Sequence, residues 1–246
     1  MLFIKRVTLI AILAYVASPS AAVAQQATDS LSGAQTVSNR AQGALPLPFR
    51  GGPLVTGFNV WMGSSFAVRT AATNEKFDGD FRMLGMQFSR TLFVLGGAQF
   101  SWLIEVLPVL TGTVGAPPAR VPTVTNNPDA YSDPTRYARY TLHSVYGVGI
   151  APLSAQVVKP FSNRFATLLS ATSGVALFNK VVPYGKATQA NFTASGSLGV
   201  EFTATPTVGV AAGYTLHHVS NASLGASNPG MNSHMLFVRL SKSLRH

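Results

Sequence analysis

Residues 190–203 (ANFTASGSLGVEFT) decide the fold, because large apolar side chains alternate there with small or polar ones. Successive residues of a β-strand point to opposite faces of its sheet. One face therefore carries Phe192, Ala194, Leu198, Val200 and Phe202, and the other carries Thr193, Ser195, Ser197 and Glu201. A period of two over this length predicts a strand with one apolar face and one polar face.

The same alternation continues through the rest of the chain from residue 54 onward and predicts eight strands. They span residues 54–63, 80–92, 98–110, 143–157, 164–178, 190–203, 206–219 and 234–244. Short connections at 94–97, 160–163 and 204–206 alternate with long ones at 64–79, 111–142, 179–189 and 220–233. An even number of strands with this alternation is typical of outer-membrane barrels, which have short periplasmic turns and long external loops.

Two further predicted strands show which face meets the solvent. Residues 98–110 place Phe100, Trp102, Ile104 and Val106 opposite Gln99, Ser101 and Glu105. Residues 234–244 place Leu236, Val238 and Leu240 opposite Arg239, Ser241 and Ser243. A polar interior with an apolar exterior is expected when the surrounding solvent is lipid, whereas a soluble lipocalin-like barrel, the alternative, turns its apolar side inward. We expect an all-β, eight-stranded antiparallel transmembrane barrel.

Composition agrees with an exported membrane protein. Charged residues make up 11% of the chain, hydrophobic residues make up 47%, and there is no cysteine. Residues 1–24 resemble a secretory signal peptide, because Lys5 and Arg6 precede an apolar run at 7–17 and an A-x-A cleavage pattern ends at Ala24. Residues 25–53 are predicted to be a flexible periplasmic lead-in, and residues 54–246 the barrel.

The charge balance indicates an anionic partner. The formal net charge is +10, of which the predicted signal peptide contributes two charges. An exported chain without a basic cluster is a poor candidate for nucleic-acid binding. Phosphorylated lipid at a bacterial surface fits better.

The candidate site lies at 218–230 (HVSNASLGASNPG), at the end of the strand predicted for residues 206–219. His218 and Ser220 lie two strand steps apart, about 6.6 Å, on one face. An imidazole that reaches a hydroxyl is the pairing that activates a serine nucleophile. Both residues share the parity of the apolar, lipid-facing set on their strand, whereas His217 points into the barrel.

The run HVSNASLGASNPGMN at 218–232 resembles the lipid A 3-O-deacylases of the PagL type, also called acyloxyacyl hydrolases. The resemblance implies a small eight-stranded outer-membrane barrel that hydrolyses an ester-linked acyl chain of lipid A with a serine–histidine site on its outer surface. It implies Ser220 as nucleophile and His218 as base. Asn221, Ala222 and Asn228 match the positions that shape the oxyanion hole. It implies lipopolysaccharide and the lipids of the outer membrane as partners, and it implies no cofactor or metal.

The chain departs from this family at one position. A glutamate twelve residues after the serine completes the family's triad, and here that position holds Asn232. No Asp or Glu follows Asn221, and Glu105 and Glu201 have interior parity. Asp129 and Asp133, in the long connection 111–142, are the other candidates for the acid.

Two functions of different classes follow. The first is an outer-membrane serine esterase that removes an acyl chain from lipid A, with Asn232 orienting His218 through its side-chain oxygen. The second is a non-catalytic barrel with a structural or lipid-binding role, which the missing acid keeps open. The sequence does not indicate the acyl position, the chain length or the oligomeric state.

Overall fold

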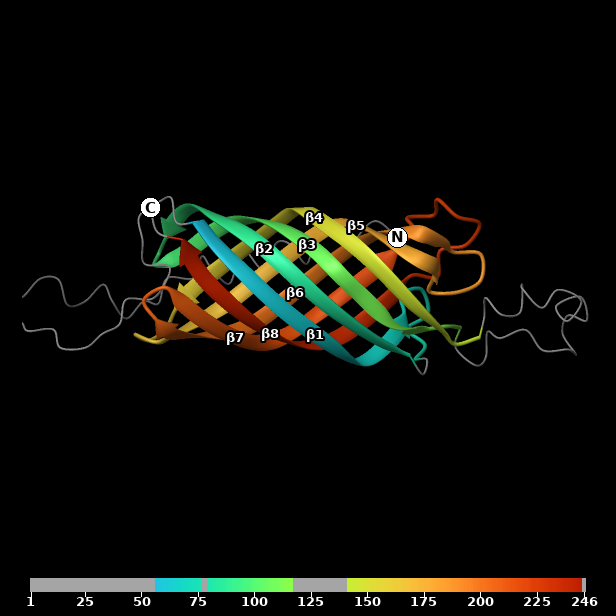
Figure 1. Cartoon of the computed structure of the whole chain (residues 1–246), viewed down its shortest axis with the longest axis horizontal. Coiled ribbons are helices and arrows are strands. Elements are labelled where there is room, and N and C mark those ends of the chain that lie inside the picture. Colours follow the sequence, from blue (N-terminus) through green and yellow to red (C-terminus); the bar gives the residue numbers. More distant parts are fainter. Residues whose placement is uncertain (1–55, 77–78, 117–140, 245–246) are drawn as a thin grey trace, which may run out of the picture. The chain divides into compact units, whose positions relative to one another are not determined.

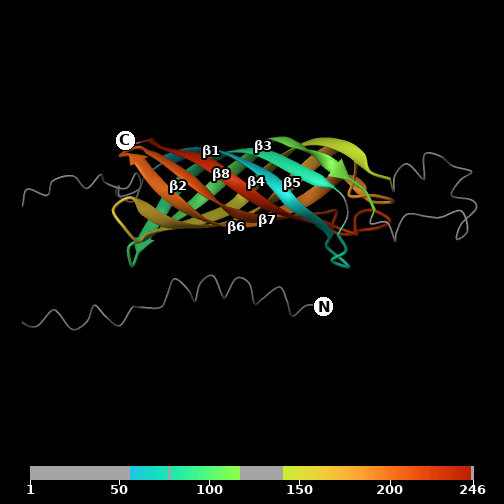
Figure 2. The same cartoon turned by 90° about the horizontal axis from the view of Figure 1, so that it is seen from below.

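The computed structural model describes residues 56–76, 79–116 and 141–244, and these form one closed antiparallel barrel in which every strand pairs with its neighbour in sequence and the last pairs with the first. Figures 1 and 2 show the strands running obliquely around the barrel. The strands are β1 (Thr56–Thr70), β2 (Asp80–Leu95), β3 (Ala98–Val114), β4 (His143–Pro160), β5 (Phe165–Val182), β6 (Thr188–Thr205), β7 (Val208–Ser220) and β8 (Met231–Leu244). Within the described residues, no helix is long and apolar enough to cross a membrane.

All eight predicted strands are present, and most are longer than the alternation indicated. The three short turns gather at one end of the barrel, and Gly96 and Gly97 form a two-residue turn with φ of 57° and 75°. The other end carries the connections 71–79, 115–142, 183–187 and 221–230. The connection expected at 179–189 shrinks to five residues, because β5 and β6 continue pairing beyond their apolar runs. The predicted signal peptide and lead-in lie outside the described residues.

The two faces of the wall are divided as predicted. Outward side chains of β6 and β8 are large and exposed, such as Leu198 (53%) and Leu240 (54%). Inward side chains of the same strands are small or polar and buried, such as Thr193 and Ser241. This arrangement excludes the soluble alternative, because a water-soluble barrel would expose the polar face. The chain is a transmembrane β-barrel.

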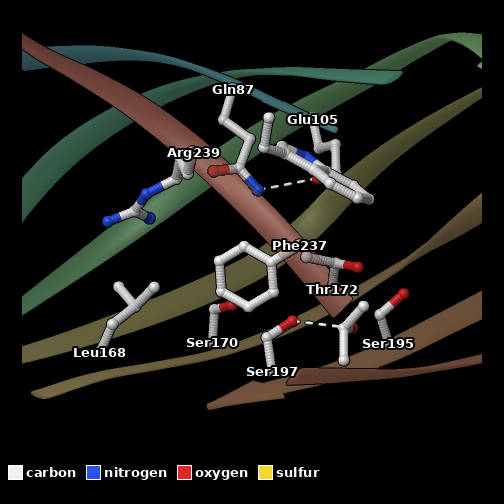
Figure 3. Close-up of a pocket in the computed structure, with 11 residues that line it drawn as sticks. Gln87, Glu105, Leu168, Ser170, Thr172, Ser195, Ser197, Phe237 and Arg239 are labelled. Atoms are coloured by element: carbon white, nitrogen blue, oxygen red, sulfur yellow. Dashed lines mark hydrogen bonds between the residues drawn. The ribbon is translucent and has the colours of Figure 1, made fainter. Parts of the chain in front are cut away.

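Polar networks fill the lumen. The Oε1 atom of Glu105 accepts hydrogen bonds from Trp61 Nε1 and Gln87 Nε2, both at 2.7 Å, and Arg239 forms a buried ion pair with Glu201. Figure 3 shows several of these side chains converging on the interior. The cavity left between them measures about 20 Å³, which is space for about one water molecule. The described lumen is thus a packed support for the wall, and the candidate site lies outside it.

Candidate active site on the outer face

The site begins with a cross-strand pair between β7 and β8. His218 lies directly opposite Asn232 in the register, and both side chains point outward. The Nδ1 atom of His218 is 2.7 Å from Oδ1 of Asn232. An amide oxygen only accepts, so Nδ1 carries a proton, and in the neutral imidazole Nε2 then keeps its lone pair. That tautomer is the one a general base needs to take a proton from a hydroxyl.

Strand β8 starts earlier than its apolar run indicates, and this creates the pair. The alternation predicted a strand from residue 234, with Asn232 in the preceding loop. Residues 231–233 instead pair with β1 and β7, so that Asn232 is fixed within the sheet rather than on a loop. The side chain that replaces the family's acid is therefore held in contact with His218 by backbone hydrogen bonds on both sides.

Ser220 is the last residue of β7, and it lies opposite Phe192 of β6. It shares the outward face of His218, as the spacing predicts, and its side chain is half-buried. Among the described residues, no hydrogen bond joins Ser220 to His218. The structure thus brings His218 and Asn232 into contact and places Ser220 on the same face, two residues from His218.

The loop after Ser220 is built around Asn221. This side chain is buried, donates through Nδ2 to the Ser227 carbonyl at 2.8 Å, and accepts through Oδ1 from the Ser223 N–H at 3.0 Å. Its own backbone N–H donates to Oδ1 of Asn228 at 3.2 Å. Asn221 is therefore occupied in holding the loop together, and its N–H is already bonded.

Several donors of this loop have no acceptor among the described residues, and two of them lie close to Ser220 in sequence or bond its neighbour Asn221. The N–H of Ala222 has no acceptor among the described residues, and Ala222 adopts a φ of 50° that turns the chain sharply after Asn221. Asn228 is exposed, and the bond to its Oδ1 leaves its Nδ2 as an unused donor within the described residues. These two groups could donate to an oxyanion near Ser220, whereas the N–H of Asn221 is already bonded.

Gly230 closes the loop beside the imidazole. Its φ is 59°, and a Cβ added there would lie 3.5 Å from Cε1 of His218 and 2.9 Å from the side chain of Ala71. The backbone of this segment also accepts from the β1–β2 connection, since Ala71 and Ala72 donate to the carbonyls of Gly230 and Pro229 at 3.2 Å. The loop of the site is thus packed against the connection between β1 and β2.

The other predicted residues lie elsewhere. Glu105 and Glu201 are buried in the lumen, which confirms that neither faces His218. His217 points inward, where its Nδ1 is 2.7 Å from Ser195 Oγ. His234 faces outward, and its Nδ1 bonds the hydroxyl of Tyr214 at 2.7 Å instead of meeting His218. Asp129 and Asp133 lie outside the described residues.

An apolar groove next to Ser220 was missed at the level of sequence. It has a volume of about 570 Å³ and lies on the outer face of β3 to β6. Phe192, the register partner of Ser220, and Leu224 of the following loop form part of its wall. Leu224 is 76% exposed, and an apolar side chain in a loop of small polar residues was the one available signal for this groove.

Comparisons with known proteins point in one direction. The family model described as lipid A 3-O-deacylase (PagL) matches residues 127–241, somewhat less than half of the chain, and this part holds the site. No curated protein matches the chain.

Solved outer-membrane barrels resemble the chain at low identity. The outer membrane enzyme PagL is 16% identical with a TM-score of 0.49, covering 74% of this chain and 97% of its own. The attachment invasion locus protein Ail of Yersinia pestis is 12% identical with a TM-score of 0.38, covering 76% and 98%. Neisserial surface protein A is 10% identical with a TM-score of 0.41, covering 76% and 97%. The family match confirms the resemblance that the 218–232 run indicated, and with the apolar belt around the closed barrel it identifies this protein as a bacterial outer-membrane barrel similar to the PagL lipid A 3-O-deacylases.

Proposed function

We propose that this barrel is an esterase that hydrolyses an ester-linked acyl chain of lipid A, with Ser220 as nucleophile and His218 as general base. The observation that carries the proposal is the bond between His218 Nδ1 and Asn232 Oδ1, which leaves Nε2 as a base on the face that Ser220 shares. The match to the family of lipid A 3-O-deacylases supports lipid A as the substrate.

The reaction follows from these roles. Nε2 of His218 takes the proton of Ser220 as its Oγ attacks the ester carbonyl, and the tetrahedral oxyanion meets the N–H of Ala222 and Nδ2 of Asn228. Collapse breaks the ester bond, and His218 returns the proton to the departing sugar alkoxide. A water molecule, deprotonated by His218, then hydrolyses the acyl-enzyme and releases a fatty acid.

The groove supplies a place for the acyl chain. It is lined almost entirely by apolar side chains, and its volume falls within the range of about 300–1,000 Å³ that is usual for ligand sites. Because Phe192 and Leu224 lie at its wall, a chain lying in the groove brings its ester toward Ser220. The outward direction of the whole site suits a substrate that stays in the outer leaflet.

Lipid A mass measured in a host of known lipid A structure tests the proposal. Expression of the wild-type chain is expected to remove one ester-linked acyl group, and Ser220→Ala and His218→Ala are each expected to abolish this loss. Ser223→Ala is the matched control, because Ser223 is an exposed serine of the same loop whose hydroxyl has no role in the proposal. An unchanged spectrum, with heat-modifiable protein in the outer membrane, would favour the non-catalytic barrel.

A further inference from the structure

A row of outward-pointing residues runs across neighbouring strands on the outer surface of the barrel, level with the candidate site. Asn232 lies opposite His218 on one side and opposite Arg69 of β1 on the other. Arg69 in turn forms an isolated antiparallel bridge with Lys76. Residues directly opposite one another in antiparallel pairs share a face, so Lys76, Arg69, Asn232 and His218 form one continuous row.

A β-bulge turns Arg69 outward. By simple alternation Arg69 would share the inward parity of Trp61 and Gly63. The register of β1 against β8 shifts between Ser65 and Ala67, and the parity reverses beyond that point. Val68 is accordingly fully buried, and Arg69 is half-exposed beside the site.

Both cations of the row have donors to spare. Nη1 of Arg69 donates to the Asn74 carbonyl at 3.0 Å, and a guanidinium has five N–H groups. Lys76 is exposed. In the described part of the chain, the ion pairs join Arg82 to Asp80 and Arg239 to Glu201, and none includes Arg69 or Lys76. The neighbouring Glu75 carboxylate accepts from the Thr73 hydroxyl at 2.7 Å.

Arg69 and Lys76 lie at a distance from the candidate site that a single lipid headgroup can span. Neighbouring strands lie about 4.8 Å apart, so the backbone of Arg69 is about one strand from Asn232 and about 10 Å from His218. An arginine with open donors binds phosphate oxygens, often in a bidentate manner. An anion held there would lie at the level of the polar headgroups while the acyl chain extends into the lipid.

We propose that Arg69 and Lys76 form a binding site for a phosphate monoester of the substrate's glycolipid headgroup and so select phosphorylated over dephosphorylated lipid. This proposal rests on the proposed function in that it names the part of the lipid A substrate that the site recognises. The two residues position the substrate, and they take no part in bond cleavage.

Equilibrium binding of lipid A to the full chain in mixed micelles tests the proposal, in the Ser220→Ala background so that no substrate is consumed. We expect lipid A to bind at least tenfold more tightly than the same lipid A after phosphatase treatment. Replacement of both residues (Arg69→Gln with Lys76→Gln) is expected to weaken binding of the phosphorylated lipid about tenfold or more, since each basic residue near an anionic lipid surface contributes about 1 kcal/mol, and to leave binding of the dephosphorylated lipid unchanged.

The control removes the same charge at the opposite end of the barrel. Arg90→Gln with Lys242→Gln changes two exposed outward cations near the short turns, and it is expected to preserve the preference. Arg69→Lys, which keeps the charge, is expected to retain most of the preference for the phosphorylated lipid. Heat-modifiability reports folding for every variant.

Three results would overturn the proposal. The first is equal affinity of the Ser220→Ala chain for both lipids, and the second is an equal loss of binding in the Arg90 and Lys242 control. The third is saturation of the Arg69 and Lys76 site by inorganic phosphate alone, with no contribution of the lipid to binding. Turnover of wild-type protein separates this proposal from the proposed function. A lipid preference without deacylation would refute the esterase and leave the phosphate site standing. Deacylation without a preference for the phosphorylated lipid would support the esterase and refute the phosphate site.

Discussion

Replacing Asn232 with aspartate is expected to raise the rate of deacylation. Oδ1 of Asn232 already lies 2.7 Å from Nδ1 of His218, and aspartate has the same shape, so the substitution puts a carboxylate oxygen where the amide oxygen now lies. The tautomer of His218 stays the same. What changes is the imidazolium that forms as Ser220 attacks, because it gains a negative partner.

The expected magnitude follows from charge and exposure. A carboxylate and an imidazolium whose charges are about 4 Å apart attract by about 4 kcal/mol at an effective dielectric constant near 20, or about 10³ in rate. Asn232 is half-exposed, and Arg69 on the next strand attracts the same carboxylate. The difference between a charged and a neutral hydrogen bond, about 1–1.5 kcal/mol, sets the lower bound at about fivefold to tenfold. We expect a gain in kcat between these limits.

The assay is release of fatty acid from lipid A in mixed micelles, followed with time. Asn179→Asp is the matched control: Asn179 is an exposed asparagine whose Oδ1 accepts from the Tyr146 N–H at 2.8 Å, as a carboxylate would. Asn232→Ala, which removes the acceptor, is expected to lower kcat at least tenfold. Asn232→Glu is expected to gain less than aspartate, because its extra methylene must displace the present contact.

A wild-type enzyme whose rate falls or stays the same on Asn232→Asp, while the protein remains folded, would refute this reasoning. The acid would then come from another element. Asp129 and Asp133 would be the residues to replace next.

Other parts of the structure give further expectations. Gly85→Ala is expected to destabilise the barrel by about 2–4 kcal/mol in urea unfolding, since the new Cβ would lie 2.1 Å from Nε1 of Trp61 and displace the indole from its bond to Glu105. Gly196→Ala is the control, and it is expected to leave stability unchanged because the space around Gly196 is open. Leu224→Asp is expected to raise KM for long-chain substrates about tenfold and to leave short-chain esters unaffected. The mature chain is expected to fractionate with the outer membrane and to migrate as a heat-modifiable band, and its recovery as a soluble protein without detergent would contradict the barrel.

Alternation was sufficient to predict the wall of the barrel, because a strand between lipid and a polar lumen must alternate along its whole length. Alternation failed to predict those strand ends where backbone pairing continues beyond the alternating residues. Residues 231–233 follow a loop of small polar residues, and nothing local to them indicates a strand, so the contact between His218 and Asn232 comes from pairing with β1 and β7. Arg69 was hidden for a different reason: the alternation placed residues 64–79 in a connection, and the bulge between Ser65 and Ala67 that sets the parity of Arg69 depends on the partner strand.

The neutral side chain at 232 and the cation at 69 belong to one electrostatic arrangement. A carboxylate at 232 would lie between His218 and Arg69 and would interact with both, which reduces the capacity of Arg69 for an external anion. The neutral amide of Asn232 leaves Arg69 free to bind an anionic group of the substrate. A phosphate bound by Arg69 and Lys76 then offsets the positive charge of these two residues, which opposes formation of the His218 imidazolium. Asn232→Asp is therefore expected to raise kcat while narrowing the discrimination between phosphorylated and dephosphorylated lipid A. Kinetics of wild type and variant on both lipids measure this. A variant that becomes faster and keeps its full preference for the phosphorylated lipid would show that the two charges act independently.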